Sequence, residues 1–549
     1  MNERRTYLGL AALVVVLWLV ALPLRPLFNP DEGRYAEIPR EMLSGGDWVI
    51  PHLNGLAYIE KPPLQYWATA ASLAVFGQNE FAARFYTALC ALGTLVVVWM
   101  TAATLWGEAA AWRSAAVLAG MLLFLVLGQL LTLDMSLTFY MTLALAGFLL
   151  AQRATPAPAV GAPGGAARRW MLVAWGAAAL GVLTKGLVAA AIPGAVLVLH
   201  TLYTRDPAVW RRLEAARGLP LFLAVTVPWH WLAARRMPGF LQFFFVHEHL
   251  ARYLTPSADR EEAWWFFIAV FALGSIPWTV SAVRVLCLGW RRRAPPGQFD
   301  AAVFLWIWIV FVGVFFSLSD SKLIPYVLPA MPALALLIGC SPAAAWRRDI
   351  VASGLVTVVA ALAAAAASLY GLRFIPATER GQYFAQLARP LGEVAALLAI
   401  CALVVLLQRR REMTRCAVVL GVGWCLAGLL LMRAAAAVAP LYSGVGLARA
   451  VDSPPRDQPV FSVGTYDQTL PFYWRRTVEL VSYRGELDFG LQRNPDAEIA
   501  ALPEFADRWS ALPEAYAVME KSMFDELNAR GLPMREVARD VHRVLVMRR

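Results

Sequence analysis

The sequence is poor in charged residues for its length. Of its 549 residues, 16% are charged and 59% are hydrophobic, and the mean hydropathy is +0.55. A soluble domain usually has about 25% charged residues. The apolar excess excludes a water-soluble protein, a disordered chain, a collagen and a coiled coil as the main architecture. It predicts a mainly α-helical, polytopic membrane protein.

Cysteine is also scarce. The six cysteines lie in or beside apolar runs, and none lies in the polar C-terminal part of the chain. A disulfide framework or a cysteine-ligated zinc site is therefore not expected. The sequence also lacks a Walker loop, a dinucleotide fingerprint and an HExxH motif, so soluble nucleotide chemistry has no motif here.

Lysine is the rarest charged residue, with only four among 49 basic residues. The arginines cluster between apolar runs, at residues 4–5, 168–169, 211–212, 291–293, 347–348 and 409–411. Cytoplasmic loops show this pattern under the positive-inside rule. The net charge of +11 therefore indicates membrane topology, and no nucleic-acid partner is expected.

A membrane-spanning helix needs about 20 apolar residues, and the sequence offers thirteen candidate runs. The first lacks a small-residue cleavage site and is predicted to be a retained signal anchor. A break at residues 184–186 leaves twelve spans as an alternative, but only thirteen puts every arginine cluster on the side of a cytoplasmic N-terminus. The runs lie near residues 7–27, 81–105, 112–131, 134–152, 170–184, 187–203, 217–235, 263–288, 299–317, 323–341, 350–370, 386–408 and 415–437.

An odd number of spans places the two chain ends on opposite sides of the membrane. We therefore expect a transmembrane domain over residues 1–438 and a small outer α/β domain over residues 439–549. Within the second domain the pattern predicts strands at 460–463, 478–481 and 544–547 and a helix at 514–530.

Two long connections, residues 28–80 and 236–262, fall on the same outer side and are predicted to form the catalytic face. The first contains two helix starts, which predict short interfacial helices. One is near Asn29, with asparagine as cap and proline at the first position, and the other is near Glu60.

Three of the four lysines, Lys61, Lys185 and Lys322, also fall on the expected outer side, opposite to the bulk of the positive charge. One interpretation is that they are interfacial anchors whose charged ends reach for water. The other is that they face an anionic group, because lysine binds phosphate as a point charge. Arg252 is a candidate second phosphate ligand.

Two aspartates are candidates for a functional role on this side. An acid near a helix N-terminus is stabilised by the helix dipole, and we favour that structural interpretation for Glu32. Asp134, however, is an ionisable group at the membrane boundary with no charged neighbour in sequence. Together, Asp31 and Asp134 could bind a cationic substrate group, orient an acceptor or take up a proton.

The outer loop also contains His247, Glu248 and His249. Their spacing does not place both histidines on one helical face, but one histidine with Glu60 or Glu248 could join a divalent metal site, with zinc as the candidate ion. Further on, Tyr326 follows Lys322 in a polar turn. It fits a membrane-interface aromatic and a hydrogen-bond donor to a headgroup equally well.

Several of these segments resemble a known family. They are Asn29-Pro-Asp-Glu-Gly-Arg-Tyr-Ala-Glu-Ile, Glu60-Lys-Pro, Leu183-Thr-Lys-Gly, Lys322-Leu-Ile-Pro-Tyr and Tyr483-Arg-Gly-Glu-Leu. They are similar to the lipid A 4-amino-4-deoxy-L-arabinose transferases, a branch of the GT-C class of polyprenyl-phosphate-dependent glycosyltransferases that also includes the protein O-mannosyltransferases. The resemblance covers nearly the whole chain. Gly33 stands where that branch usually has threonine.

The resemblance implies an inverting pentosyltransferase of the bacterial inner membrane. Its donor would be undecaprenyl phosphate-linked 4-amino-4-deoxy-L-arabinose, and its acceptor a lipid A phosphate at the periplasmic face. Masking that phosphate would give resistance to polymyxin and cationic peptides. Membrane lipids are the other expected partners, and no cofactor is firmly required beyond the candidate zinc.

The expected roles follow from the donor chemistry. Sugar transfer leaves negative charge on the lipid phosphate, so fixed cations should stabilise the transition state. The acceptor phosphate is already a nucleophile, so the aspartates are expected mainly to orient the substrates. The phosphate ligands would be Lys61 first, then Arg34, Arg252 and Lys185; the catalytic carboxylates Asp31 and Asp134; and the pocket residues Tyr35, Tyr58, Tyr326 and Lys322.

Two alternatives remain open from the sequence. A protein O-mannosyltransferase-like enzyme would have a hydroxyl acceptor and would need Asp31 as a base. A lipid flippase or secondary transporter would be expected to place ionisable groups near mid-membrane and to show inverted repeats. Here the ionisable groups collect on one side and no repeat is evident.

Overall fold

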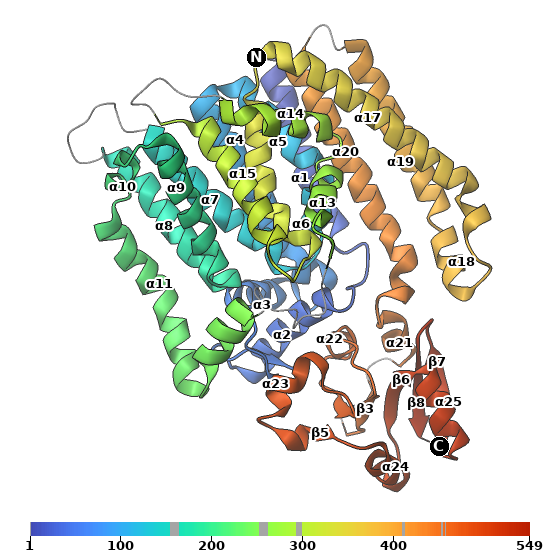
Figure 1. Ribbon diagram of the computed structural model, residues 1–549. Helices are drawn as coiled ribbons and strands as arrows, with labels where there is room; N and C mark the ends of the chain where they lie inside the picture. Colours follow the sequence, from blue (N-terminus) through green and yellow to red (C-terminus); the bar gives the residue numbers. More distant parts are fainter. Residues whose placement is uncertain are drawn as a thin grey trace.

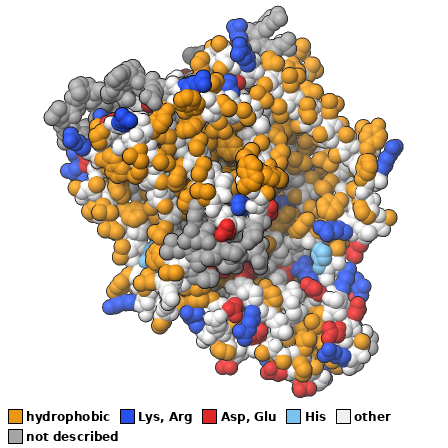
Figure 2. Space-filling model, viewed as in Figure 1, with side chains coloured by type: hydrophobic (Ala, Val, Ile, Leu, Met, Phe, Trp, Pro, Cys, Tyr) orange, Lys and Arg blue, Asp and Glu red, His pale blue; other side chains and the backbone are white. Residues whose placement is uncertain are grey.

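The long apolar runs form a helical bundle that lies above a smaller α/β domain (Figure 1). The computed structural model describes residues 2–153, 164–251, 262–291, 299–408, 412–451, 454–455 and 457–548. Hydrophobic side chains cover much of the visible surface of the bundle, and charged side chains are concentrated on the smaller domain (Figure 2). This division is the one that the composition predicts for a membrane part and an aqueous part.

Among the described residues, six helical segments are long and apolar enough to cross a membrane. The thirteen predicted runs all coincide with helices, but several of these are short, so the count of thirteen spans stays a prediction. The six segments are Glu3–Ala21, Glu80–Trp106, Leu133–Arg153, Ala343–Phe374, Glu379–Gln408 and Met413–Leu441. They contain α1 (Asn2–Ala21), α4 (Glu80–Trp106), α7 (Leu133–Arg153), α17 (Ala343–Tyr370), α18 (Glu379–Ala385), α19 (Ala388–Gln408) and α20 (Met413–Ala434).

Further helices complete the bundle. They are α5 (Glu108–Gly120), α6 (Leu122–Gly128), α8 (Gly165–Lys185), α9 (Val188–Thr204), α10 (Ala208–Arg211), α11 (Ala215–Arg236), α13 (Phe266–Gly274), α14 (Thr279–Leu288), α15 (Ala301–Ser317), the 3₁₀ turn η3 (Ile324–Ala330) and α16 (Met331–Gly339).

Two of the predicted spans are broken, and the breaks lie against each other. Helices α5 and α6 meet at a bend of 68°. Helices α13 and α14 are separated around Pro277, which has no amide hydrogen to continue a helix. The amide of Leu122, at the first break, donates to the carbonyl of Ile276 at the second, at 3.3 Å. Such pairing is how a bundle accommodates interrupted helices away from water.

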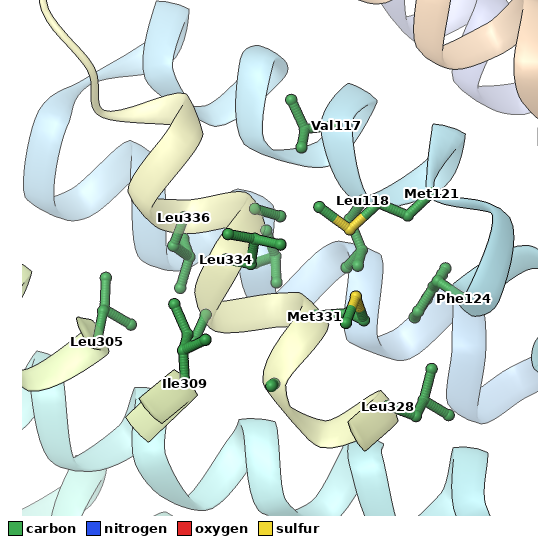
Figure 3. Packing of buried hydrophobic residues seen from close by; sticks show 14 of the residues in the cluster. Val117, Leu118, Met121, Phe124, Leu305, Ile309, Leu328, Met331, Leu334 and Leu336 are labelled. Carbon is green, nitrogen blue, oxygen red and sulfur yellow. The ribbon is translucent and has the colours of Figure 1, made fainter. Parts of the chain in front are cut away.

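The core of the bundle is packed around α16. Figure 3 shows Met331, Leu334 and Leu336 of this helix among side chains of α5, α6 and α15. Met121 and Phe124 approach from α6 and the turn before it, and all five side chains are fully buried. The shortest apolar helices are therefore held inside the bundle by close packing.

The C-terminal part forms a six-stranded sheet in the order β5-β4-β3-β6-β8-β7. Strands β3 to β6 are parallel, and β8 joins β6 antiparallel with β7 outside it. The strands are β3 (Val460–Val463), β4 (Glu479–Val481), β5 (Glu498–Ile499), β6 (Tyr516–Glu520), β7 (Met534–Arg539) and β8 (Arg543–Arg548). The helices are α21 (Val445–Ala450), α22 (Leu470–Trp474), α23 (Asp488–Leu491), α24 (Leu502–Ala511) and α25 (Lys521–Ala529).

The three predicted strands are confirmed as β3, β4 and β8. The predicted helix at 514–530 is wrong in its first half, where β6 lies between β3 and β8, and only α25 is helical. Strand pairing on both sides and burial of Ala517–Met519 override the helix preference of Ala, Met and Glu. The predicted boundary at 438/439 falls within the 3₁₀ turn Ala435–Leu441 and stays a prediction.

The predicted interfacial helices lie between the bundle and the sheet domain (Figure 1). They are α2 (Asp31–Gly45) and α3 (Leu64–Phe76), joined by a small hairpin of β1 (His52–Leu53) and β2 (Leu56–Ala57). The second helix start is confirmed. The cap assigned to Asn29 is wrong, because its side chain donates to Asp467 Oδ2 of the sheet domain, at 2.5 Å.

The other outer connection begins where α11 ends at Arg236. It continues as the π-helix η1 (Gln242–Ala251). Arg252 lies outside the described residues, as do the side chains of His247 and His249. The N-terminus lies at the end of the bundle far from the sheet domain (Figure 1).

Candidate functional site

The first turn of α2 is fixed by a buried ion-pair network around Glu32. Its carboxylate receives bonds from Arg25 at 2.5 and 2.9 Å and from Arg84 at 2.8 and 2.9 Å. It also accepts the amides of Phe28 and Leu131, at 3.1 and 2.9 Å. Burial alone would raise the pKa of Glu32, but the two guanidinium groups hold it well below the usual range. Glu32 therefore anchors α2, in line with the structural role favoured for it.

Asp31, the preceding residue, has the opposite environment. Its side chain is 52% exposed and pairs with Arg34 Nη2 at 2.6 Å. The Nη1 atom of Arg34 donates to the hydroxyl of Tyr58 at 2.9 Å and to the carboxylate of Glu486 from the sheet domain. Gln468 completes the group by donating to Glu486 at 2.6 Å. Both domains therefore contribute to holding one guanidinium group.

The phenol of Tyr35 lies at the centre of this neighbourhood. Burial raises the pKa of Tyr35; Arg34 opposes that shift, whereas the carboxylates of Asp31, Glu60 and Asp134 add to it. These three carboxylates, which are remote in sequence, are thus close enough to act on one hydroxyl. Burial likewise raises the pKa of Tyr58, so both phenols remain protonated and able to donate hydrogen bonds.

A second ion pair joins Lys185 and Asp134. Lys185 is the last residue of α8 and Asp134 lies in the first turn of α7. The ammonium group of Lys185 bonds the Asp134 carboxylate and lies 5.0 Å from the ring centroid of Tyr326. The break at residues 184–186 therefore marks the end of α8. Lys185 at this end lies over the ring of Tyr326 and beside the carboxylate of Asp134.

Lys61 forms the third ion pair. Its ammonium group lies 2.8 Å from Glu248 Oε2 of the π-helix η1 and 3.0 Å from the backbone carbonyl of Glu60. The side chains of Lys61 and Glu248 are 16% and 5% exposed. The two outer connections predicted to form the catalytic face thus meet at this pair.

The structure gives different outcomes for the remaining predicted site residues, which are Lys322, Glu60 and the candidate metal ligands. Lys322 has no ion pair within the part of the chain that the structure describes. Glu60 lies near Tyr35 and Tyr58, as their pKa shifts indicate. No group of three His, Cys, Asp or Glu side chains is placed to hold a metal ion in the described ranges. The histidine side chains of the predicted metal site lie outside them, so that site stays a prediction.

The structure thus brings most of the predicted residues into one region. Three cations with limited exposure each face a carboxylate, beside phenols that remain protonated. Such a site can hold an anionic group if the group replaces those carboxylates as a ligand. The gathered residues are Asp31, Arg34, Tyr35, Tyr58, Glu60, Asp134, Lys185 and Tyr326, with Lys61 next to them.

Sequence reasoning did not assign a role to Glu486 or Gln468. Gln468 lies in a turn of the sheet domain, and Glu486 lies in the 3₁₀ turn Gly485–Leu487, 452 residues from Arg34. The only signal for Glu486 was its place in the Tyr483-Arg-Gly-Glu-Leu segment. Glu248 was considered as a metal ligand, and its pairing with Lys61 was not predicted. No local pattern identifies such partners.

Two family models match the chain. The model described as the aminoarabinose transferase C-terminal domain matches residues 447–548. The model described as dolichyl-phosphate-mannose-protein mannosyltransferase matches residues 4–244. The two matches fall on the sheet domain and on the first half of the bundle.

The chain is also similar to curated proteins. An undecaprenyl phosphate-alpha-4-amino-4-deoxy-L-arabinose arabinosyl transferase 1 of Sodalis glossinidius is 37% identical over 343 residues, 60% of this chain and 58% of that protein. A protein of the same name, without the final number, from Pseudomonas paraeruginosa is 33% identical over 347 residues, 62% and 60% of the two chains. The chain thus matches about three fifths of the length of these relatives.

The structural similarity extends further. The crystal structure of ArnT from Cupriavidus metallidurans bound to undecaprenyl phosphate has a TM-score of 0.89 and 34% identity, covering 98% of this chain and 97% of that one. The apo form of the same protein has a TM-score of 0.89 and 32% identity, covering 100% and 98%. Both domains and their junction are included in the match.

Proposed function

Because the chain belongs to the aminoarabinose transferase family, we propose that it transfers 4-amino-4-deoxy-L-arabinose from undecaprenyl phosphate to a phosphate of lipid A. The near full-length similarity to ArnT bound to undecaprenyl phosphate carries this proposal. The reaction takes place at the periplasmic face of the bacterial inner membrane, with the N-terminus in the cytoplasm and the sheet domain in the periplasm. Polymyxin resistance is the expected phenotype.

The cations of the site serve the leaving group. An oxygen of the acceptor phosphate forms a bond to the anomeric carbon, and the bond from that carbon to the donor phosphate breaks with inversion. The electron pair of the broken bond stays on undecaprenyl phosphate. Lys61, Arg34 and Lys185 stabilise this growing charge, because fixed cations in a partly dry site lower the energy of the transition state most.

The carboxylates have two roles in this proposal. Before the donor binds, Glu248 and Asp134 neutralise cations whose burial would otherwise be costly, and Glu486 fixes the position of Arg34. When the lipid phosphate enters, it takes over as the ligand of these cations. Asp31, which is half exposed, is then free to orient the ammonium group of the sugar. No strong base is needed, because the acceptor phosphate is already ionised.

The direct test is mass spectrometry of lipid A from bacteria that lack their own aminoarabinose transferase, with and without this chain. Lipid A carrying an added aminopentose only when the chain is present is the expected result. The Lys61→Ala variant, expressed at the same level, serves as the inactive control. If lipid A stays unmodified although the donor is supplied and the protein is correctly inserted, lipid A is not the acceptor.

A second candidate follows from the mannosyltransferase model that matches residues 4–244. An enzyme of that kind acts on a hydroxyl group, which would make Asp31 an essential base. Radiolabelled donor offered with lipid A or with a serine-containing peptide separates the two functions. A flippase, in contrast, would move the donor across liposomes when no acceptor is present.

A further inference from the structure

A separate cavity lies at the junction between the bundle and the sheet domain. Its volume is about 240 Å³, and its walls come from the turn between α3 and α4, from α21 and from α22. None of its lining residues belongs to the predicted transfer site. The cavity is therefore a second region whose chemistry the proposed reaction does not explain.

The cavity is positioned at the membrane boundary. Glu80, in its wall, is the first residue of the spanning segment Glu80–Trp106, and Val445 follows the end of the spanning segment Met413–Leu441 by four residues. Basic side chains lie along this junction below the apolar surface of the bundle (Figure 2). A ligand here can therefore have one part in water and another in the bilayer.

The polar wall carries two cations. Arg449 and Arg475 line the cavity and are exposed, and neither has an ion pair or side-chain hydrogen bond within the described part of the chain. The one carboxylate in the wall is Glu80, which accepts the hydroxyl of Tyr473 at 3.0 Å. The lining thus has a net positive charge. Pairs of guanidinium groups of this kind bind phosphate oxygens.

Hydrogen bonds hold the backbone of the wall in place. The hydroxyl of Tyr473 accepts the amide of Leu27 at 2.8 Å, and Gln78 Nε2 donates to the carbonyl of Phe472 at 2.5 Å. Arg475 ends α22 in the left-handed backbone region, at φ 58°. Glycine or asparagine is favoured there, so helix capping gives no reason for an arginine at this position.

An apolar surface adjoins the cavity. Val75 and Phe76, just before the turn, are 74% and 44% exposed. The ring of Phe76 packs with Phe81 at 5.3 Å and with Phe85 at 4.9 Å between centroids. Acyl chains of a bilayer can cover this aromatic surface, whereas a free anion gains nothing from it.

We propose that this junction cavity binds the phosphate headgroup of a membrane lipid with net negative charge, with Arg449 and Arg475 as the phosphate ligands. The acyl chains of this lipid lie along Phe76, Phe81 and Phe85. The bound lipid stabilises the contact between α22 and the start of α4, and so holds the sheet domain against the membrane surface. This proposal concerns a site apart from the transfer site and holds whichever sugar is transferred.

The test is native mass spectrometry of the full-length protein, released from a neutral detergent after incubation with phosphatidylglycerol or phosphatidylcholine. The double variant Arg449→Gln/Arg475→Asn removes both charges, and asparagine tolerates the left-handed backbone. Arg530→Gln, at an exposed position in the same domain, is the matched control. Equal unfolding midpoints of the three proteins show that the variants fold.

We expect the wild type and the Arg530→Gln control to retain phosphatidylglycerol in preference to phosphatidylcholine. The double variant should need about tenfold more of the anionic lipid for the same occupancy. The Lys61→Ala variant should still bind it at this site. Equal binding of the two lipids by the wild type, or unchanged binding by the double variant, overturns the proposal.

Two further outcomes also decide against it. If Lys61→Ala removes the bound anionic lipid and the double variant does not, the lipid occupies the transfer site. If inorganic phosphate at equal ionic strength displaces the lipid completely, the cavity is a site for free anions. If the chain does not transfer sugar in cells but the lipid-binding results are as expected, only the proposed function is contradicted.

Discussion

Two groups of ion pairs lie at the start of α2, and water reaches them to different degrees. The side chains of Glu32, Arg25 and Arg84 are 1–3% exposed, and both oxygens of the carboxylate are fully bonded. One residue earlier, Asp31 is half exposed and has a single cationic partner. The buried group can only hold the fold together, whereas the open group can exchange its partner for a ligand.

The difference arises from helix geometry. Consecutive side chains on a helix point about 100° apart, so one acid of the pair opening α2 faces the bundle and the other is exposed. A sequence motif of two adjacent acids therefore combines one structural and one candidate functional residue.

Removing the charge of Glu32 should cost the most. In Glu32→Gln two buried guanidinium groups lose their counter-charge, which typically costs about 3–5 kcal/mol. We expect a lower unfolding midpoint in detergent and little protein in the membrane fraction. The matched change at the open position, Asp31→Asn, should leave the midpoint near that of the wild type. Equal midpoints for Glu32→Gln and the wild type would contradict the structural role.

Lys61→Ala should lower sugar transfer by about 10³-fold, because it removes a fixed cation from the leaving phosphate. The rate is measured with purified protein, donor and lipid A. Lys521→Ala, which removes an outer-domain lysine paired with Glu379, is the control and should retain full activity. Transfer within a few-fold of the wild type would exclude Lys61 from the mechanism.

Asp31→Asn should reduce transfer by about 10²-fold while the protein inserts and folds normally. The loss reflects misorientation of the sugar ammonium group, so it should appear with lipid A as acceptor over the whole pH range of the enzyme. A loss that instead disappears at high pH would point to a base, and with it to a hydroxyl acceptor.

Glu486→Gln should have a smaller effect, about a tenfold loss of transfer. The substitution removes the negative charge that fixes Arg34 and weakens the hydrogen bond from Gln468. Asp31 remains as a partner of Arg34, so the effect is limited. We expect KM for the donor to rise more than kcat falls. An unchanged KM would show that the sheet domain does not position Arg34 for the donor.

The smallest effect is on pH dependence. Burial raises the pKa of Glu486 above 4.5, although Arg34 and Gln468 oppose the shift. On acidification Glu486 should therefore take up a proton earlier than an ordinary glutamate and release Arg34, and transfer should decline at a pH above 4.5. Because its folded pKa exceeds the unfolded one, this protonation does not itself destabilise the fold. In Glu486→Gln this part of the activity loss at low pH should be absent. If the pH–activity profiles of the variant and the wild type fall identically at low pH, protonation of Glu486 is not the cause.

Particular residues show how far the sequence was sufficient. The rare lysines Lys61 and Lys185 are predicted to be candidate site residues, and the structure pairs them with Glu248 and Asp134. The strands at 460–463 and 544–547 were also correctly predicted. The predicted helix at 514–530 is wrong in its first half because neighbouring strands stabilise β6. The predicted cap at Asn29 is wrong because its side chain bonds the distant Asp467.

The sequence by itself determined that the chain is a membrane protein with a C-terminal α/β region. Hydropathy, helix length and loop charge are local properties, so a single sequence contains them. Only the tertiary structure decided which carboxylate faces each cation. The partners are separated by 51, 187 and 452 residues, and such pairs form only when packing brings α2, α8, η1 and the sheet domain together.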